Sequence, residues 1–126
     1  MGYCHADIEL SNPRLPNLEK LAVQAMADTS ALTLCIPEHV RVQLQLEEVE
    51  KREVTVADGR RALVSYVGPV RVWFRNRSCF VGALVLGDEV LLGAVPMEDM
   101  DLVVCPSTRM VIVNPQSPNF PQALVK

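Results

Sequence analysis

An acidic residue directly after an apolar segment is the first feature of this sequence that suggests chemistry. The segment 21–27 is mostly apolar and ends at Asp28-Thr29-Ser30-Ala31, after which the apolar pattern resumes. A carboxylate between two buried strands must be hydrogen-bonded or charge-compensated, because burying it alone is costly. It is also a side chain that general acid–base chemistry uses. The pattern alone nevertheless favours a turn in which the Asp28 side chain binds the local backbone, helped by Thr29 and Ser30.

The cysteines and histidines offer no second reactive centre. None of the four cysteines forms a Cys-x-x-Cys pair, and their wide spacing suits neither a zinc site nor a small disulfide scaffold. Because each cysteine lies in an apolar run, we expect buried, reduced thiols. The histidines have no partner at ligand spacing, so we expect no metal, no cofactor and no Ser-His or Cys-His pair. These six residues are Cys4, Cys35, Cys79, Cys105, His5 and His39.

The composition indicates one compact, soluble domain. The chain has 126 residues, 49% of them hydrophobic and 21% charged, so we expect a single domain over 1–126, too small for two catalytic lobes. The net charge of −3 argues against a nucleic-acid partner, since such proteins normally carry a basic excess. No apolar run approaches the roughly 20 residues that span a bilayer, and the first residues do not resemble a secretion signal. We therefore expect a cytoplasmic protein without a membrane partner.

Apolar runs, many of them alternating with polar residues, predict β-strands over most of the chain. Residues 3–10 alternate between apolar and polar side chains, which is typical of a half-buried strand. Strands are expected over 3–10, 21–27, 32–36, 52–57, 61–67, 70–75, 79–86, 102–105 and 110–113. The dipeptide Asp58-Gly59 predicts a two-residue type I′ hairpin, because both central positions of that turn need a positive φ. Gly68-Pro69 is expected to break the chain.

Two short helices and a proline-rich end complete the pattern. Pro37 suits the first position of a short helix, and Pro96 opens a helical turn that runs through Met100. Residues 114–126 contain too many prolines for a central strand and should run extended over the surface. The fold predicted from these elements is mainly β and barrel-like, with one or two short helices.

Three short motifs, taken in order, resemble those of the retropepsin-like aspartic proteases, which are the retroviral-type enzymes and their single-lobe cellular relatives. Residues 28–31 resemble the family's active-site signature, Asp-Thr/Ser-Gly-Ala/Ser. The hairpin at 57–59 lies where the family carries its flap, and the Leu-Leu-Gly sequence at 91–93 resembles its second hallmark. The resemblance covers about residues 3–113, is closest to the bacterial and archaeal branch, and implies a closed acid-protease-type β-barrel.

This resemblance implies a homodimeric endopeptidase that hydrolyses peptide bonds with water. In the family two aspartates share one proton, because like charges so close together cannot both ionise. The charged aspartate takes a proton from water, the neutral one donates to the substrate carbonyl, and no covalent intermediate forms. Only Asp28 precedes a Thr or Ser here, so the second carboxylate must be Asp28 of another copy. Thr29 would hydrogen-bond across that interface.

The resemblance also implies which residues surround the paired carboxylates. Ser30 and Ala31, together with the hairpin tip Ala57, Asp58 and Gly59, would contact the peptide or protein substrate as the hairpin closes. An ordinary surface hairpin is the alternative interpretation of the same tip.

A second group would support the active-site turn from behind. It consists of Leu91, Leu92 and Gly93, where the glycine allows the backbone to approach closely. A buried strand that ends at a turn is the alternative interpretation.

Ser30 departs from the family's pattern, which has glycine at this position. Its side chain could narrow the cleft, bind the catalytic carboxylates, or leave an inactive scaffold. The alternative function is therefore a catalytically silent, dimeric binding module. A third possibility is an unrelated β-barrel ligand binder in which Asp28 only caps a turn.

Overall fold

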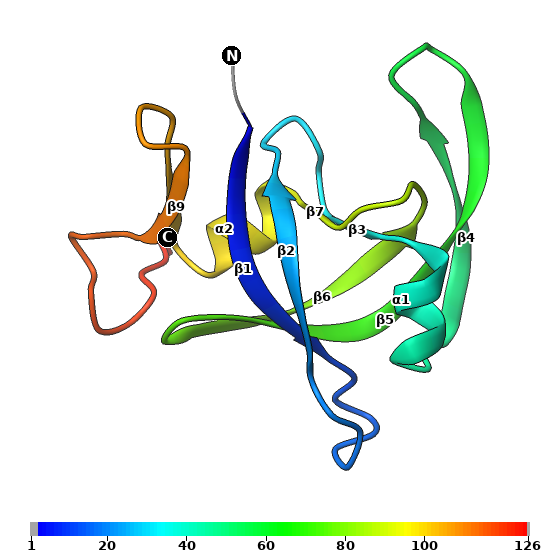
Figure 1. Ribbon diagram of the computed structural model, residues 1–126, viewed down its shortest axis with the longest axis horizontal. Helices are drawn as coiled ribbons and strands as arrows, with labels where there is room; N and C mark the ends of the chain where they lie inside the picture. The colour runs from blue at the N-terminus through cyan, green and yellow to red at the C-terminus, as the bar shows by residue number, and fades with distance from the viewer. Residues whose placement is uncertain (1–2, 126) are drawn as a thin grey trace.

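The structure, a computed structural model, describes residues 3–125 as nine strands and two short helices (Figure 1). No helix among these residues is long and apolar enough to cross a membrane. The elements are β1 (Cys4–Ser11), β2 (Leu21–Ala27), β3 (Leu34–Ile36), α1 (Glu38–Gln43), β4 (Glu48–Thr55), β5 (Arg61–Phe74), β6 (Arg77–Val85), β7 (Leu91–Leu92), α2 (Ala94–Asp99), β8 (Leu102–Cys105) and β9 (Met110–Val113).

Six of the strands close into a barrel of mixed strand directions. The sheet order is β4-β5-β6-β3-β7-β2-β1-β9-β8, and a further pairing of β5 with β1 closes the ring β1-β2-β7-β3-β6-β5. The pairs β2–β7 and β3–β6 are parallel, whereas the other pairs of the ring are antiparallel. The predicted mainly β, barrel-like fold with short helices is therefore confirmed.

The core of this barrel is aliphatic, and β1 shows how the sequence forms it. Ala6, Ile8 and Leu10 are buried, and the residues between them are exposed, as expected when successive side chains point to opposite faces. Full burial of a side chain of the size of Ile8 or Leu10 contributes about 1.5–3 kcal/mol to stability. Burial on one face thus fixes the register of the strand.

The prediction that Gly68-Pro69 breaks the chain is wrong. Strand β5 continues through both residues, and its register against β6 shifts between Val67 and Val70. A β-bulge of this kind leaves the extra residues out of the ladder, so a proline that cannot donate a hydrogen bond is tolerated there. The bulge joins the barrel part of β5 to the part that pairs with β4, which projects from the barrel as a long hairpin (Figure 1).

The predicted type I′ turn at the tip of this hairpin is also wrong. Gly59 has a φ of +89°, but Asp58 is not in the positive-φ region. The N–H of Val56 donates to the Arg60 carbonyl at 2.8 Å, and the N–H of Gly59 donates to the Val56 carbonyl at 2.9 Å. The loop Ala57-Asp58-Gly59 therefore has three residues, and only its last one needs the freedom of glycine.

Both helices begin at positions other than those predicted. Pro37 lies before α1 as its N-cap residue instead of being its first residue. Helix α2 begins at Ala94, two residues before Pro96. The first four N–H groups of a helix have no intrahelical acceptor, so a proline in the first turn loses no hydrogen bond.

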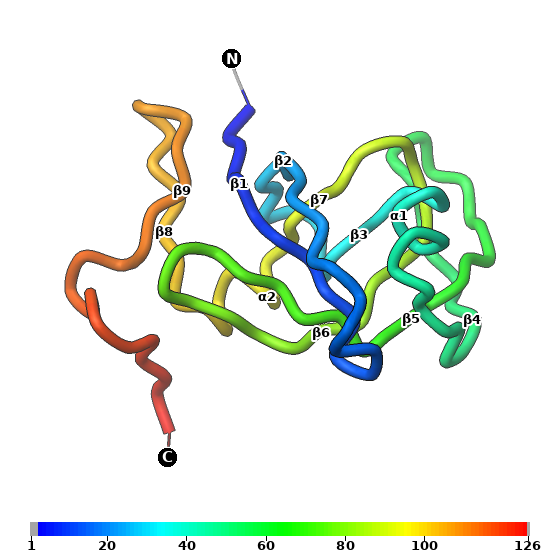
Figure 2. Tube along the Cα trace, turned by 60° about the horizontal axis from the view of Figure 1, so that its bottom comes forward, coloured from blue at the N-terminus to red at the C-terminus, as the bar shows by residue number. Residues whose placement is uncertain are grey.

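The C-terminal residues 114–125 contain no helix or strand and are held by polar contacts. The Asp101 carboxylate accepts hydrogen bonds from Asn114 Nδ2 at 3.1 Å, Ser117 Oγ at 2.5 Å and the N–H of Gln122 at 3.0 Å. The buried Arg77 side chain donates to the carbonyl of Ser117. Figures 1 and 2 both show this tail near β8 and β9, away from the β4–β5 hairpin.

Candidate active site at the end of β2

Asp28 is the first residue after β2, and the neighbouring strand β7 fixes its backbone. The two strands run parallel, with Ala27 opposite Leu92. The N–H of Asp28 donates to the Leu92 carbonyl at 3.0 Å, and the N–H of Ala31 donates to the Asp28 carbonyl at 3.1 Å. The acid therefore stands in a tight turn at the end of a hydrogen-bonded strand pair.

The Asp28 carboxylate is half-buried and accepts its hydrogen bonds from Ser30 alone among the described residues. The Ser30 N–H and Oγ both donate to Asp28 Oδ1, at 3.0 and 2.5 Å. Atom Oδ2 accepts no hydrogen bond from any residue in 3–125. Thr29 and Ser30 are exposed. The side-chain turn expected from the pattern alone is therefore present, with Ser30 supplying both donors, and one carboxylate oxygen stays free for other partners.

Gly93 packs against the far side of this turn. A Cβ atom at this position would lie 2.2 Å from the Thr33 carbonyl oxygen and 2.7 Å from the Ala31 carbonyl oxygen. Real Cβ atoms essentially never come so close to backbone atoms. The same carbonyl of Ala31 accepts the N–H of Ala94 at 2.8 Å. The absence of a side chain at 93 thus lets α2 begin directly beneath the Asp28 turn.

A cavity of about 650 Å³ lies between the Asp28 turn and the β4–β5 hairpin. Besides the turn, it is lined by 52–57, Cys35, Leu84, Leu86 and Leu91. Its size is within the roughly 300–1,000 Å³ of typical ligand pockets. Figure 1 shows the turn after β2 and the hairpin tip at the same end of the molecule. The cavity therefore combines largely apolar walls with a carboxylate that has a free oxygen.

The cavity brings together only part of the site predicted from the sequence. The predicted residues that line it are Asp28, Ser30, Ala31, Ala57 and Leu91. The predicted residues that do not line it are Thr29, Asp58, Gly59, Leu92 and Gly93. Leu91 was expected behind the turn, but it forms part of the cavity wall.

Several lining residues were not singled out from the sequence. Arg52, Val54 and Val56 share one face of the hairpin, and their spacing of two could have indicated this. Leu84 and Leu86 come from the end of β6. No sequence signal marks them, because only the parallel pairing of β3 with β6 brings that end to the Asp28 turn.

Cys35 lines the cavity as well, but its thiol is unsuited to act as a nucleophile. Burial raises the pKa of this thiol, and the nearby Asp28 charge raises it further. A thiol with a raised pKa stays protonated near neutral pH, whereas the thiolate is the reactive form. All four cysteines are free; Cys79 is buried as expected, whereas Cys4 and Cys105 are only half-buried.

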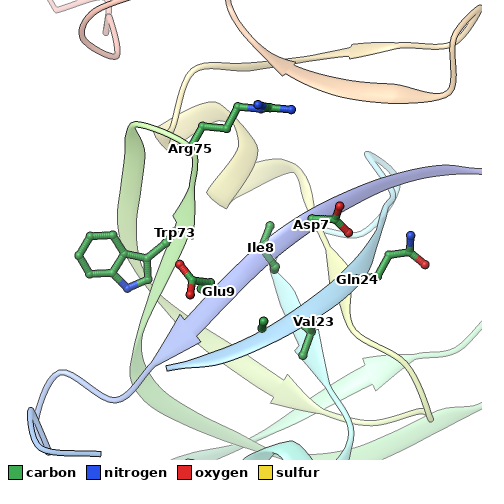
Figure 3. Close-up of a pocket in the computed structure, with 8 residues that line it drawn as sticks. Asp7, Ile8, Glu9, Val23, Gln24, Trp73 and Arg75 are labelled. Atoms are coloured by element: carbon green, nitrogen blue, oxygen red, sulfur yellow. The ribbon is translucent and has the colours of Figure 1, made fainter. Parts of the chain in front are cut away.

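A second hollow, of about 390 Å³, lies over β1, β2 and β5 (Figure 3). Its polar lining includes Asp7, Glu9, Gln24 and Arg75. Figure 3 shows Trp73 and Arg75 pointing away from each other, and the labelled polar groups do not converge on one point. Convergent polar groups are what fix a ligand in a pocket. No cluster of three or more His, Cys, Asp or Glu within 3–125 is arranged to hold a metal ion. We therefore take the Asp28 cavity as the candidate site.

Comparison with known proteins identifies no family. No protein family and no curated protein matches the sequence. Among solved structures, the chain is similar to the protease of Simian Foamy Virus (mac), with a TM-score of 0.46 and 16% identity, over 72% of this chain and 90% of that one. It is also similar to a protein of unknown function from Legionella pneumophila, with a TM-score of 0.42 and 14% identity, over 80% of this chain and 91% of that one. We therefore base the functional proposal on this chain's own residues.

Proposed function

We propose that this protein is a retropepsin-like aspartic endopeptidase that works as a homodimer, with Asp28 of each copy activating the attacking water. The observation that carries the proposal is the setting of Asp28. Its backbone is held by Leu92 on the adjacent strand, one carboxylate oxygen is free, and the side chain lines a cavity of about 650 Å³. The sequence motif at 28–31 and the close packing of Gly93 are consistent with this role.

The second carboxylate would come from a second copy of the chain. Glu53 is the other acidic residue that lines the cavity, but its carboxylate lies 3.8 Å from Arg61. Beside the Asp28 turn, Leu32 and Val95 are 70% and 44% exposed, and the N–H of Val95 donates to the Leu32 carbonyl at 2.8 Å. Exposed apolar side chains next to a half-site suit burial in a symmetric interface.

The proposed chemistry uses one proton shared by the two carboxylates. Because two like charges at close range cannot both ionise, one Asp28 is charged and the other is neutral. The charged carboxylate removes a proton from water, whose oxygen attacks the peptide carbonyl, and the neutral carboxyl donates its proton to the carbonyl oxygen. The resulting diol collapses as the amine nitrogen takes the proton that the first carboxylate had removed from water, while one hydroxyl of the diol returns its proton to the other carboxylate. The carbon–nitrogen bond breaks, and a free amine and a carboxylic acid are released. No covalent bond between the protein and the substrate forms at any stage.

Ser30 favours a second candidate, a dimeric binding module without catalysis. Its hydroxyl lies 2.5 Å from Asp28 Oδ1, so it competes with water and substrate for that oxygen. In this alternative the cavity binds a peptide segment but does not cleave it.

The test is cleavage of a peptide library by the purified protein and by Asp28→Asn. We expect the substitution to lower kcat/KM by at least about 100-fold, the lower end of what general acid–base groups contribute. Asp88→Asn is the matched control, because Asp88 is exposed and does not line the cavity. Equal cleavage by the wild type and Asp28→Asn would exclude the proposal. Peptide binding without any cleavage by the wild type would favour the binding module.

A further inference from the structure

Among residues 3–125, Arg52 is the only cation that lines the cavity. It lies on β4, on the same face as Val54 and Val56, and its side chain is 44% exposed. A partly exposed guanidinium at the rim of a mostly apolar cavity can reach a bound molecule without being fully desolvated. Its position therefore makes it a candidate contact for whatever occupies the cavity.

Two contacts hold the guanidinium in place. Its central carbon lies 3.7 Å from the centre of the Tyr66 ring, and its Nε donates to Glu50 Oε2 at 2.8 Å. Tyr66 is itself confined, because a Cβ atom at Gly82 would lie 2.1 Å from the Tyr66 hydroxyl. Stacking on an aromatic ring fixes the plane of an arginine, so less freedom is lost when it binds a ligand.

No acidic group of the described residues occupies the outer edge of this guanidinium. Glu50 takes only the Nε donor of Arg52, and the Tyr66 hydroxyl is the one further side-chain group among residues 3–125 that interacts with the guanidinium. Of the nearby acids, Glu53 is 3.8 Å from Arg61, and Glu50 is already used. The two terminal nitrogens present parallel N–H groups whose spacing matches the two oxygens of a carboxylate.

We propose that Arg52 determines substrate specificity by binding a carboxylate of the substrate. The apolar walls formed by Leu84, Leu86 and Leu91 take an apolar side chain, and Arg52 pairs with an acidic group next to it. The preferred substrates are therefore peptides in which an apolar residue is next to an acidic residue, or in which the apolar residue is followed by the terminal carboxylate. This inference rests on the proposed function for the cleavage step, but the binding preference does not require cleavage.

Matched peptides test the inference directly. We expect the wild type to favour a Glu-containing peptide over its Gln counterpart by about tenfold in kcat/KM, as a charge-assisted hydrogen bond supplies. Arg52→Gln should bring this ratio to about one. Arg52→Glu should lower the ratio below one and should favour a counterpart peptide that contains Lys instead of Glu. Lys51→Gln is the control, because Lys51 lies next to Arg52 on β4 without lining the cavity, and its ion-pair partner Glu48 does not line the cavity either. This variant should keep the wild-type ratio. A ratio that Arg52→Gln leaves unchanged would overturn the inference.

Binding separates this inference from the proposed function. Fluorescence anisotropy with labelled peptides on Asp28→Asn should show the same preference for acidic peptides, and Asp28→Asn/Arg52→Gln should lose it. Preferential binding without wild-type cleavage would sustain the role of Arg52 and overturn the protease. Cleavage without a charge preference would sustain the proposed protease and overturn the role of Arg52. Peptides with a free or an amidated C-terminus then distinguish a terminal carboxylate from an acidic side chain.

Discussion

The hydrogen bond between Ser30 and Asp28 has the largest influence on the proposed chemistry of this site. Of the two donors to Asp28 Oδ1, the backbone N–H would be present with any residue except proline at position 30, whereas the second donor is the hydroxyl of the serine side chain. A glycine, which the resembled family carries here, would keep the first contact and lose the second. The side chain thus adds both a donor and bulk beside the carboxylate.

Substitution of Ser30 can separate these two effects. We expect Ser30→Gly to raise kcat/KM about tenfold, because releasing one oxygen from a hydrogen bond to a charged group recovers about 1.5 kcal/mol. Ser30→Ala removes the hydroxyl but keeps Cβ, so an equal gain would assign the effect to the hydrogen bond and a smaller gain to crowding. Steady-state kinetics on one peptide measures both variants. A loss of activity in both would show that the hydroxyl assists the reaction.

Gly93 lends itself to a stability measurement. Gly93→Ala would place a Cβ atom 2.2 Å from the Thr33 carbonyl oxygen, so the Asp28 turn or α2 must move. Overpacking of this kind costs about 3 kcal/mol in the free energy of unfolding. Gly87→Ala is the comparison, because its φ is +78° but its Cβ would meet nothing within 4 Å, and it should cost about 1–2 kcal/mol. Urea unfolding measures both, and an equal cost would contradict close packing at Gly93.

Among the elements, the bounds of strands with a strong apolar–polar alternation could be predicted from sequence, whereas those of the charged strand β4 and the bulged strand β5 could not. Strands β1 and β2 coincide with the predicted 3–10 and 21–27 almost residue for residue. Strand β4 begins at Glu48, four residues before the predicted start at 52, because its first residues are mostly charged and exposed and show no alternation. The bulge at 68–69 escaped prediction because Gly-Pro is also typical of a chain break.

The C-terminal tail depends on Asp101, and this makes its attachment sensitive to pH. Hydrogen bonds from Ser117, Asn114 and the Gln122 N–H, in that order, and then the charge of Arg77, lower the pKa of Asp101 below its ordinary value of 3.8. A carboxylate with a lowered folded-state pKa stabilises the attached state above its unfolded pKa. That stabilisation is lost as pH falls through the folded value.

We expect the tail to detach at acidic pH, below 3.8, while it stays attached at neutral pH. The amide resonance of Gln122 in an NMR titration reports this directly, because its N–H donates to Asp101 at 3.0 Å. In Asp101→Asn the same resonance should lie near its detached position at every pH. A Gln122 resonance that moves identically in both proteins would contradict the role of Asp101.

At the scale of the whole molecule, the site exists because distant segments pair in parallel. Strand β7 lies between β2 and β3, so Leu92 can accept the N–H of Asp28 although the two residues are far apart in the chain. Periodicity in the sequence indicates which residues form strands, but it does not say which strands pair. The motifs at 28–31 and 91–93 were found from sequence, whereas the cavity wall from β6 required the pairing of β3 with β6 in the closed barrel.

Because one chain supplies only one Asp28 carboxylate to the proposed site, we can also predict how a substitution at the dimer interface affects self-association. Val95 is 44% exposed on α2, beside the Asp28 turn, and Val42 is 56% exposed on the other helix, α1. If two copies meet at the Asp28 turn, Val95→Glu puts two unpaired charges into the interface, one from each copy. Burying such charges is costly, so the dimer dissociation constant should rise at least about tenfold.

Val42→Glu is the matched control and should leave self-association unchanged. Sedimentation of the two variants and the wild type over a range of concentrations measures the dissociation constant. Activity should follow the dimer fraction, so Val95→Glu should lose activity when diluted and regain it when concentrated, because association is governed by mass action. Equal dissociation constants for Val95→Glu and Val42→Glu would place the interface elsewhere. Activity that does not change on dilution to monomer would show that one chain holds a complete site.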